Sequence, residues 1–180
     1  MADRLCVCGV AGAGKSALAR VLERDYGYKV LKFADPMKDM LRVLGLGNRE
    51  LEGDRKESPC GLLGGRTPRW AMQSLGTEWG RGLMGESFWV DAWRRRVEAL
   101  AEWPDAKLVV DDCRFPNELE AARSLGFVPV RIWREGAAKA HARGWREGHI
   151  SEYALDEVWM PEFENHGTPE DLARVILGEV

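Results

Sequence analysis

The sequence predicts a three-layer α/β fold, in which a parallel five-stranded sheet is covered by helices on both faces. Short apolar runs typical of buried strands alternate with stretches of helical spacing, and the connections are long enough to hold crossover helices. The first apolar run also ends in glycines and leads directly into an amphipathic stretch. We expect ligands at the carboxyl ends of the strands, as in other open α/β sheets.

Five apolar runs are expected to form the strands. They cover residues 5–10, 28–33, 108–112, 127–133 and 158–163. The first run, LCVCGV, is apolar throughout, as in a strand buried on both faces of a parallel sheet. Residues 15–25 then carry leucine and valine at helical spacing, and Gly27 follows as a stop signal, which predicts the first helix.

The connection between the second and third strands, about residues 34–106, is far too long for a simple crossover. We expect it to form a helical lobe within a single domain. Thr67 followed by Pro68 marks a helix start. A later helix should bury four apolar residues spaced at 3, 4 and 3 positions: Val90, Trp93, Val97 and Leu100. A capping-box pattern at 168–171 predicts the last helix.

Composition narrows the class of protein. The chain has 180 residues, 45% of them apolar, which suits one domain with its own core. A formal net charge of -3 gives no basic field that would wrap a duplex, so a nucleic-acid polymer is not expected as partner. No apolar run approaches the roughly 18 residues of a membrane helix, and the start lacks a signal peptide. We expect a soluble, cytoplasmic protein without membrane contact; whether it forms a homodimer stays open.

Four cysteines stand at positions 6, 8, 60 and 113. Cys6 and Cys8 are separated by one residue within a strand pattern, which is not the spacing of zinc ligands. We expect these two thiols to be buried on one strand face as small apolar groups, and not to form a metal site or a disulfide.

A phosphate-binding loop follows the first strand, because residues 9–16 fit the pattern G-x-x-x-x-G-K-[ST] between a strand and a helix. Its glycines allow N–H groups to turn inward around a phosphate at the positive end of a helix. Lys15 should reach the β- and γ-phosphates of ATP as a catalytic residue, and Ser16 should place its hydroxyl on Mg²⁺. The ATP-binding residues expected here are Gly9, Ala11, Gly12, Ala13, Gly14, Lys15, Ser16 and Ala17.

The other motifs favour a kinase among P-loop proteins. No aspartate is followed by glycine three residues later and no asparagine is followed by lysine, so the D-x-x-G and N-K-x-D patterns of GTPase switches are missing. A motor would bring further domains, whereas the longest insertion here lies where an acceptor site fits. The sequence therefore predicts a P-loop kinase fold with a helical acceptor-binding insertion and a lid.

Several further segments resemble the deoxynucleoside monophosphate kinases encoded by bacteriophages. They are FADPMK at 33–38, QSLGTEWGR at 73–81, DCRFPNE at 112–118, HISE at 149–152 and NHGT at 165–168. With the phosphate-binding loop, the resemblance covers nearly the whole chain. It implies transfer of the γ-phosphate of ATP, with Mg²⁺, to a deoxynucleoside monophosphate (dNMP), in the cytoplasm of a host cell if the protein is phage-encoded.

Acceptor residues are assigned on two segments. Asp35 and Lys38 follow the second strand at the ligand-binding edge; alternatively, Asp35 caps the helix that Pro36 begins and Lys38 lies on its solvated face. On the helical lobe, guanidinium groups can hold a phosphate and an amide can read a base edge, although each arginine can instead form a surface ion pair. These lobe residues are Arg66, Arg69, Gln73 and Arg81.

Charged residues also follow the third strand, which ends at Asp111 and Asp112. The family motif aligns with Asp112, which we assign to Mg²⁺ and to the substrate. Arg114 is assigned to the acceptor or transferring phosphate and to catalysis. Asn117 and Glu118 can equally be ordinary residues in the first turn of a helix.

Residues 134–150 have the composition of a lid that closes over the reaction. We expect closure to bring the catalytic Arg134 to the γ-phosphate, with Arg143 and Arg146 in the same stretch; the alternative is a solvated charged helix. His149 and Glu152 match the family pattern without a derived role.

The end of the chain carries the last site residues. Asn165, Gly167 and Thr168 resemble the loop that contacts adenine through its backbone in related kinases, although a plain helix cap at Thr168 explains much of this segment. Three tryptophans offer rings for stacking on a base: Trp70, Trp79 and Trp89. Two rival functions remain, namely a kinase of another small phosphorylated acceptor, such as a phosphomevalonate-like compound, and a non-catalytic ATP-binding regulatory module.

Overall fold

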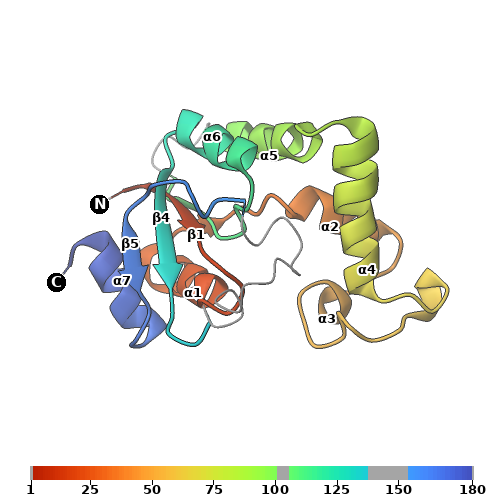
Figure 1. The fold of residues 1–180 in the computed structure, drawn as a ribbon, viewed down its shortest axis with the longest axis horizontal. Coiled ribbons are helices and arrows are strands. Elements are labelled where there is room, and N and C mark those ends of the chain that lie inside the picture. Colours follow the sequence, from red (N-terminus) through yellow and green to blue (C-terminus); the bar gives the residue numbers. More distant parts are fainter. Residues whose placement is uncertain (1, 101–105, 138–153, 180) are drawn as a thin grey trace. The chain divides into compact units, whose positions relative to one another are not determined.

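The computed structural model describes residues 2–100, 106–137 and 154–179, and its ribbon is drawn in Figure 1. The chain divides into two compact units. We call Met1–Lys32 with Val97–Val180 the sheet unit and Phe33–Arg96 the helical unit. Within the described ranges, no helix combines the length and the apolar character that crossing a membrane requires.

The sheet unit contains the five-stranded parallel sheet that the sequence predicts. Its strands are β1 (Arg4–Cys8), β2 (Lys29–Val30), β3 (Leu108–Val110), β4 (Val128–Trp133) and β5 (Glu162–Glu164). Their order across the sheet is β2-β3-β1-β4-β5, and every neighbouring pair is parallel. Since parallel strands end at the same edge, the loops that follow β1, β3 and β4 emerge side by side.

Helices cover the sheet. The sheet unit holds α1 (Lys15–Tyr26), α6 (Pro116–Ser124) and α7 (Pro169–Leu177), and α5 (Phe88–Ala99) ends in it. Leu5 and Val7 of β1 belong to the core formed with α1 and α7, which lie beside each other in Figure 1. Because side chains alternate along a strand, Cys6 and Cys8 point to the opposite face of the sheet.

The helical unit has a core of its own, centred on Met37, Leu41 and Leu51. Its elements are α2 (Asp35–Val43), α3 (Asn48–Leu51), the 3-10 helix η1 (Gly61–Leu63), α4 (Pro68–Gln73), the π-helical segment η2 (Ser74–Met84) and the start of α5. The predicted start of α4 is confirmed, since the Thr67 hydroxyl accepts a hydrogen bond from the Trp70 backbone N–H at 3.1 Å.

The predicted apolar face of α5 is buried at three of its four positions. Val90, Trp93 and Val97 are at most 5% exposed, whereas Leu100 is half-buried. Trp93 also packs against Phe33, with 4.2 Å between ring centroids. This helix therefore contributes core side chains, as its 3-4-3 spacing indicates.

The wide π-helical segment η2 is fitted to the ring of Trp89. The Trp89 indole N–H donates to the carbonyl oxygen of Gly76 at 2.8 Å. A Cβ at Gly80 would overlap the same ring. The glycine at position 80 thus lets the helix backbone approach the indole closely.

The bounds of β1, β3 and β4 differ from the prediction by at most two residues, and those of β2 and β5 differ by more. The fifth strand begins at Glu162 and not at Val158, because Pro161 has no N–H for the ladder and the Val158 carbonyl accepts from the Arg131 side chain at 2.9 Å. The second strand is only two residues long. After it, the Lys32 side chain turns to Asp111, and the next residue belongs to the helical unit.

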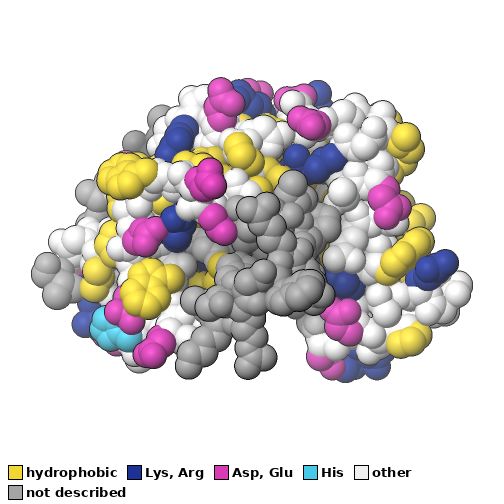
Figure 2. All heavy atoms as spheres, viewed as in Figure 1, with side chains coloured by type: hydrophobic (Ala, Val, Ile, Leu, Met, Phe, Trp, Pro, Cys, Tyr) yellow, Lys and Arg dark blue, Asp and Glu magenta, His cyan; other side chains and the backbone are white. Residues whose placement is uncertain are grey.

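Charged side chains of both signs are interspersed over the described surface on the face drawn in Figure 2. Several form ion pairs, for example Arg24 with Asp25 and Glu170 at 2.6 and 2.8 Å. These exposed pairs contribute little to stability.

Candidate active site

The loop after β1 has the backbone of a phosphate cradle. Gly9, Gly12 and Gly14 have φ angles of 136°, 81° and 102°, which favour glycine. A Cβ at Gly9 would overlap the carbonyl oxygen of Ile132 on β4, so the loop needs glycine there for space as well. Gly14 is the N-cap of α1, and the positive end of this helix therefore points into the loop.

Lys15 is held against the loop that it follows. Its Nζ donates to the carbonyl oxygens of Gly9 and Val10 at 2.7 and 2.8 Å. The residue is only 8% exposed. A cation fixed at this position is suited to a phosphate bound by the loop. Ser16 lies exposed in the first turn of α1.

Asn165 connects the end of β5 to this loop. Its Nδ2 donates to the carbonyl oxygen of Ala13 at 2.8 Å, and its backbone N–H donates to the Trp133 carbonyl at 2.7 Å. Arg134 then donates to the backbone and side-chain oxygens of Asn165 at 3.2 and 3.4 Å. The Asn165 side chain thus positions the loop, a role that the sequence did not suggest.

Two carboxylates follow β3, and they differ in burial. Asp112, the predicted Mg²⁺ residue, is half-buried, whereas Asp111 is only 2% exposed. Lys32 Nζ lies 3.2 Å from Asp111 Oδ2. Among the described residues, Asp111 Oδ1 has no hydrogen-bond partner. Sequence reasoning missed the Lys32–Asp111 pair, because the two residues meet only across neighbouring strands.

Glu118 has a structural role at the start of α6. Its Oε2 accepts from the backbone N–H groups of Arg114 and Phe115 at 2.7 and 3.1 Å, and the residue is 4% exposed. The prediction of a first-turn residue is therefore confirmed. By fixing these N–H groups, Glu118 also sets the backbone from which the Arg114 side chain leaves.

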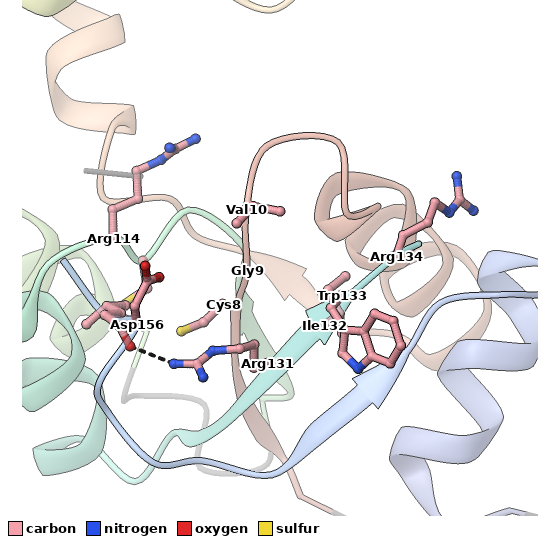
Figure 3. A pocket seen from close by; sticks show the side chains of 11 residues that line it. Cys8, Gly9, Val10, Arg114, Arg131, Ile132, Trp133, Arg134 and Asp156 are labelled. Atoms are coloured by element: carbon pink, nitrogen blue, oxygen red, sulfur yellow. Dashed lines mark hydrogen bonds between the residues drawn. The ribbon is translucent and has the colours of Figure 1, made fainter. Parts of the chain in front are cut away.

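A pocket of about 100 Å³ opens beside these loops, at the carboxyl edge of β1 and β4 (Figure 3). Its lining consists of Cys8, Gly9, Val10, Cys113, Arg114, Arg131, Ile132, Trp133, Arg134, Leu155 and Asp156. In Figure 3, the Arg114 and Arg134 side chains extend on opposite sides of the loop that carries Gly9 and Val10. Both predicted catalytic arginines therefore border the same pocket as the start of the phosphate-binding loop.

Arg131 builds one wall of this pocket, and sequence reasoning missed it. Its guanidinium donates to the carbonyl oxygens of Leu155 and Val158 at 2.6 and 2.9 Å and pairs with Glu162 at 2.6 Å. The sequence signal that could have indicated Arg131 is its position as a lone arginine in an otherwise apolar strand. The residue fastens the turn before β5 to β4.

The cysteines of β1 are buried, as predicted, but they have a third partner. Cys113, after β3, lies with Cys6 and Cys8 so that all three sulfur atoms are within 4.8 Å of one another. Hydrogen bonds from Cys113 and Cys6 lower the pKa of Cys8. Hydrogen bonds to Cys6 and Cys8, together with burial, raise the pKa of Cys113.

In the helical unit, Lys38 is buried. It is 8% exposed, and its Nζ lies 2.6 Å from Glu52 Oε1. The alternative of a solvated Lys38 is therefore wrong, because α2 turns this side chain toward the unit's interior. Helix α2 begins at Asp35 with Ala34 as its N-cap, so Asp35 lies in the first turn of the helix and not at the N-cap position.

The remaining predicted acceptor residues lie along the stretch from η1 to η2. Arg66 stacks on the half-exposed Trp70 ring at 4.5 Å. Arg69 pairs with Glu57 at 2.8 Å, and Arg81 donates to the carbonyl of Glu86 at 3.3 Å. Gln73 is exposed. Each of these arginines thus has a contact within the unit, which a ligand would have to share or replace.

The three candidate tryptophans have different surroundings. Trp89 is 5% exposed, and Trp79 packs against it at 6.0 Å between centroids. Trp70 is 44% exposed. Of the three, Trp70 presents the most ring surface to solvent.

Thr168 caps α7, as the capping-box pattern predicts. Its Oγ1 accepts from the Asp171 backbone N–H at 3.1 Å, and the Asp171 carboxylate accepts from the Thr168 backbone N–H at 3.1 Å. Gly167 precedes this cap and is exposed. The predicted lid is described only from Arg134 to Ala137, so Arg143, Arg146, His149 and Glu152 lie outside the described residues.

A parallel sheet with a glycine-rich loop, a buried loop lysine and carboxylates after the adjacent strand defines a P-loop kinase fold. Two crystal structures share this fold. One is TT1252 from Thermus thermophilus, 21% identical, with a TM-score of 0.51 over 98% of this chain and 96% of that chain. The other is the “putative kinase” of Chloroflexus aurantiacus, 12% identical, with a TM-score of 0.50 over 99% of this chain and 97% of that chain. No protein-family model matches the chain.

A viral protein identifies the family. It is the “Putative deoxynucleotide monophosphate kinase” of Acanthamoeba polyphaga mimivirus, which is 32% identical over 143 residues that span 72% of this chain and 73% of the relative. The chain belongs to the deoxynucleotide monophosphate kinase family of this relative. It is an ATP-dependent phosphotransferase that acts on small molecules.

Proposed function

We propose that this protein transfers the γ-phosphate of ATP to a dNMP, giving ADP and the deoxynucleoside diphosphate. The observation that carries the proposal is the cradle after β1, where Lys15 Nζ lies 2.7 Å from the Gly9 carbonyl inside a loop of positive-φ glycines. The acceptor class is supported by the name of the viral relative and by the segments at 33–38, 73–81 and 112–118. Kinship with phage enzymes in particular, and a cytoplasmic location, are parts of the same proposal.

The chemistry needs little acid–base help. An oxygen of the acceptor phosphate attacks the γ-phosphorus of ATP. The new oxygen–phosphorus bond forms while the bond to the β,γ-bridging oxygen breaks, and that electron pair leaves with ADP. Because the acceptor oxygen is already anionic, catalysis depends on positioning and on neutralising charge.

The sheet unit supplies the donor side in this proposal. The loop N–H groups and Lys15 hold the β- and γ-phosphates, and Arg114 and Arg134, at the border of the same pocket, neutralise the transferring group. The backbone at Gly167 and Thr168 contacts adenine. The single domain with a helical lobe at about 34–106 and a lid at about 134–150 stays part of the proposal.

The oxygen donors near the loop fit Mg²⁺. Ser16 offers a hydroxyl in the first turn of α1, and Asp111 and Asp112 offer carboxylates at the end of the adjacent strand. The buried Asp111 Oδ1 lacks a partner among the described residues, as expected near a cation or its water shell. Ser16 and Asp112 would hold the ion, which neutralises phosphate charge when bound.

The helical unit supplies the acceptor residues in this proposal. Arg69 and Arg81 hold the acceptor phosphate, Gln73 reads the base, and Asp35 and Lys38 contact the same ligand. Arg66 contributes a further positive charge. Each arginine would exchange its present contact for the phosphate on binding.

A substrate panel tests the proposal. ADP release is measured with ATP and Mg²⁺ against the four dNMPs, their ribose counterparts and phosphomevalonate, with Lys15→Ala as the control. We expect rapid, Lys15-dependent release with at least one dNMP. ADP release with phosphomevalonate and with none of the nucleotides would show that the acceptor is not a dNMP. ATP binding without ADP release with any acceptor would favour the non-catalytic ATP-binding regulatory module.

A further inference from the structure

Three of the four cysteines gather at the carboxyl ends of β1 and β3. Cys6 and Cys8 lie in β1, and Cys113 follows β3. Their sulfur atoms lie within 4.8 Å of one another, and all three residues are buried. Because Cys6 pairs with Val110 in the parallel register, the fold brings Cys113 to β1 across a long sequence separation.

We propose that Cys6, Cys8 and Cys113 form a binding site for a thiophilic d¹⁰ cation, of the class of Zn²⁺, Cd²⁺ and Cu⁺. Three sulfurs that each lie about 2.3 Å from a shared metal ion are about 4 Å apart. The Cys6 and Cys8 sulfurs are 4.0 Å apart. Because all three sulfurs lie within 4.8 Å of one another, a small inward movement of the Cys113 sulfur is enough to bring the set to the spacing that a shared ion needs. Thiolate ligands select cations of this class over hard ions such as Mg²⁺.

The surroundings favour a charged cluster. Three thiolates carry more negative charge than one such cation neutralises, so positive side chains nearby are needed. The Arg131 side chain lies beside Cys8 in Figure 3, and Arg131 and Lys15 both act electrostatically on the Cys8 thiol. The basic groups that hold the pocket wall and the phosphate loop thus also favour the thiolate form of Cys8.

Access and coordination number limit the choice of cation. Cys8 and Cys113 line the pocket, so a small ion can reach them from solvent. Among the described residues, no fourth His, Cys, Asp or Glu joins the group. The site therefore suits an ion that accepts three sulfurs, or one that takes a small ligand such as water in the fourth position.

The competing account is a trio of thiols that only hydrogen-bond to one another in the core. It predicts the same sulfur–sulfur distances but no affinity for a cation. The two accounts differ in what happens when a thiophilic ion is added to folded protein. The site is independent of the acceptor assignment, because no nucleotide enters the argument.

A cadmium titration tests the proposal. Reduced protein, freed of chelator, is titrated with Cd²⁺ alone while sulfur-to-cadmium charge-transfer absorption and the thermal midpoint are recorded. We expect one Cd²⁺ per chain, a charge-transfer band and a raised midpoint, since a cation bound only by the folded state stabilises it. Cys60→Ser, outside the cluster, should behave as the wild type does.

Single substitutions complete the test. Cys113→Ser and Cys6→Ser, each checked for native circular dichroism, should bind Cd²⁺ at least about tenfold more weakly, because each loses a direct ligand. No band in the wild type would overturn the proposal, and this outcome does not depend on any variant folding. An undiminished band in a folded Cys113→Ser, or its loss in Cys60→Ser, would also overturn it.

Discussion

The side chain of Asn165 holds the backbone of Ala13, with 2.8 Å between Nδ2 and the carbonyl oxygen. Ala13 lies inside the phosphate-binding loop, and Asn165 follows β5 near the other end of the chain. The same Nδ2 fills the space that a Cβ at Gly14 would need. The loop is therefore shaped by a distant residue as well as by its own glycines.

Asn165→Ala should loosen the loop. The Ala13 carbonyl would lose its buried donor, which costs about 1–3 kcal/mol of unfolding free energy, and ATP affinity should fall roughly tenfold, as about 1.4 kcal/mol of lost preorganisation implies. Calorimetry with ATP and thermal unfolding measure both. His166→Ala, at an exposed neighbour, is the control. Unchanged ATP affinity in a folded Asn165→Ala would show that the Asn165–Ala13 hydrogen bond does not contribute to ATP binding.

Two glycines with positive φ form a matched pair, because only one of them touches the site. At Gly27 (φ 73°) nothing lies within 4 Å of an added Cβ, whereas at Gly14 (φ 102°) the Cβ would meet Asn165. Gly27→Ala should cost about 1 kcal/mol from backbone strain alone. Gly14→Ala should cost more and should abolish ATP binding. Denaturant unfolding and ATP titration of both variants check this, and equal losses in the two would refute the steric argument.

Lys38 tests the acceptor assignment. Lys38→Met and Glu52→Gln both remove the ion pair between the two side chains, but only the first removes the cation proposed to contact the acceptor. We expect Lys38→Met to raise KM for the dNMP about tenfold or more, as loss of a charge-assisted contact implies, with KM for ATP unchanged. Glu52→Gln should leave KM for the dNMP nearly unaltered. If the two variants had the same KM for the dNMP, the contribution of Lys38 would be structural and not a contact to the acceptor.

Thr168 separates helix capping from adenine binding. Thr168→Ala removes the Oγ1 that accepts from Asp171 N–H and should lower stability by about 1 kcal/mol. Because the proposed adenine contact uses the backbone, KM for ATP should stay the same. Thr168→Ser, which keeps the hydroxyl, is the control for chemical denaturation and steady-state kinetics. A higher KM for ATP without a loss of stability would assign the side chain to adenine.

Much of the fold was predictable because its signals are local. The run at 5–10, the glycine-rich loop and the helix after it follow one another directly, and each is set by short-range sterics and hydrophobic periodicity. The fifth strand was misplaced because Val158–Met160 is apolar without being a strand. There the Arg131 side chain donates a hydrogen bond to the Val158 carbonyl oxygen. A side-chain contact between residues distant in the sequence cannot be read from the spacing of apolar residues.

The site was predictable only where a motif marks it. Lys15 and its loop follow from the pattern at 9–16, and the cap at Thr168 follows from its neighbours. The Asn165–Ala13 contact, the Lys32–Asp111 pair and the position of Cys113 each depend on strand order, which the sequence pattern leaves undetermined. The missed residues are accordingly those that connect one strand end to another.

The central claim is that Lys15 supports transfer, and not mere hydrolysis, of the γ-phosphate to a dNMP. The most direct measurement follows radiolabel from [γ-³²P]ATP in the presence of Mg²⁺ and each dNMP, with wild type and Lys15→Met compared. The account predicts labelled deoxynucleoside diphosphate with the wild type and a loss of at least about a hundredfold in Lys15→Met, a typical cost of removing one group that stabilises transition-state charge. Label found only in inorganic phosphate, or equal transfer by both proteins, would contradict it.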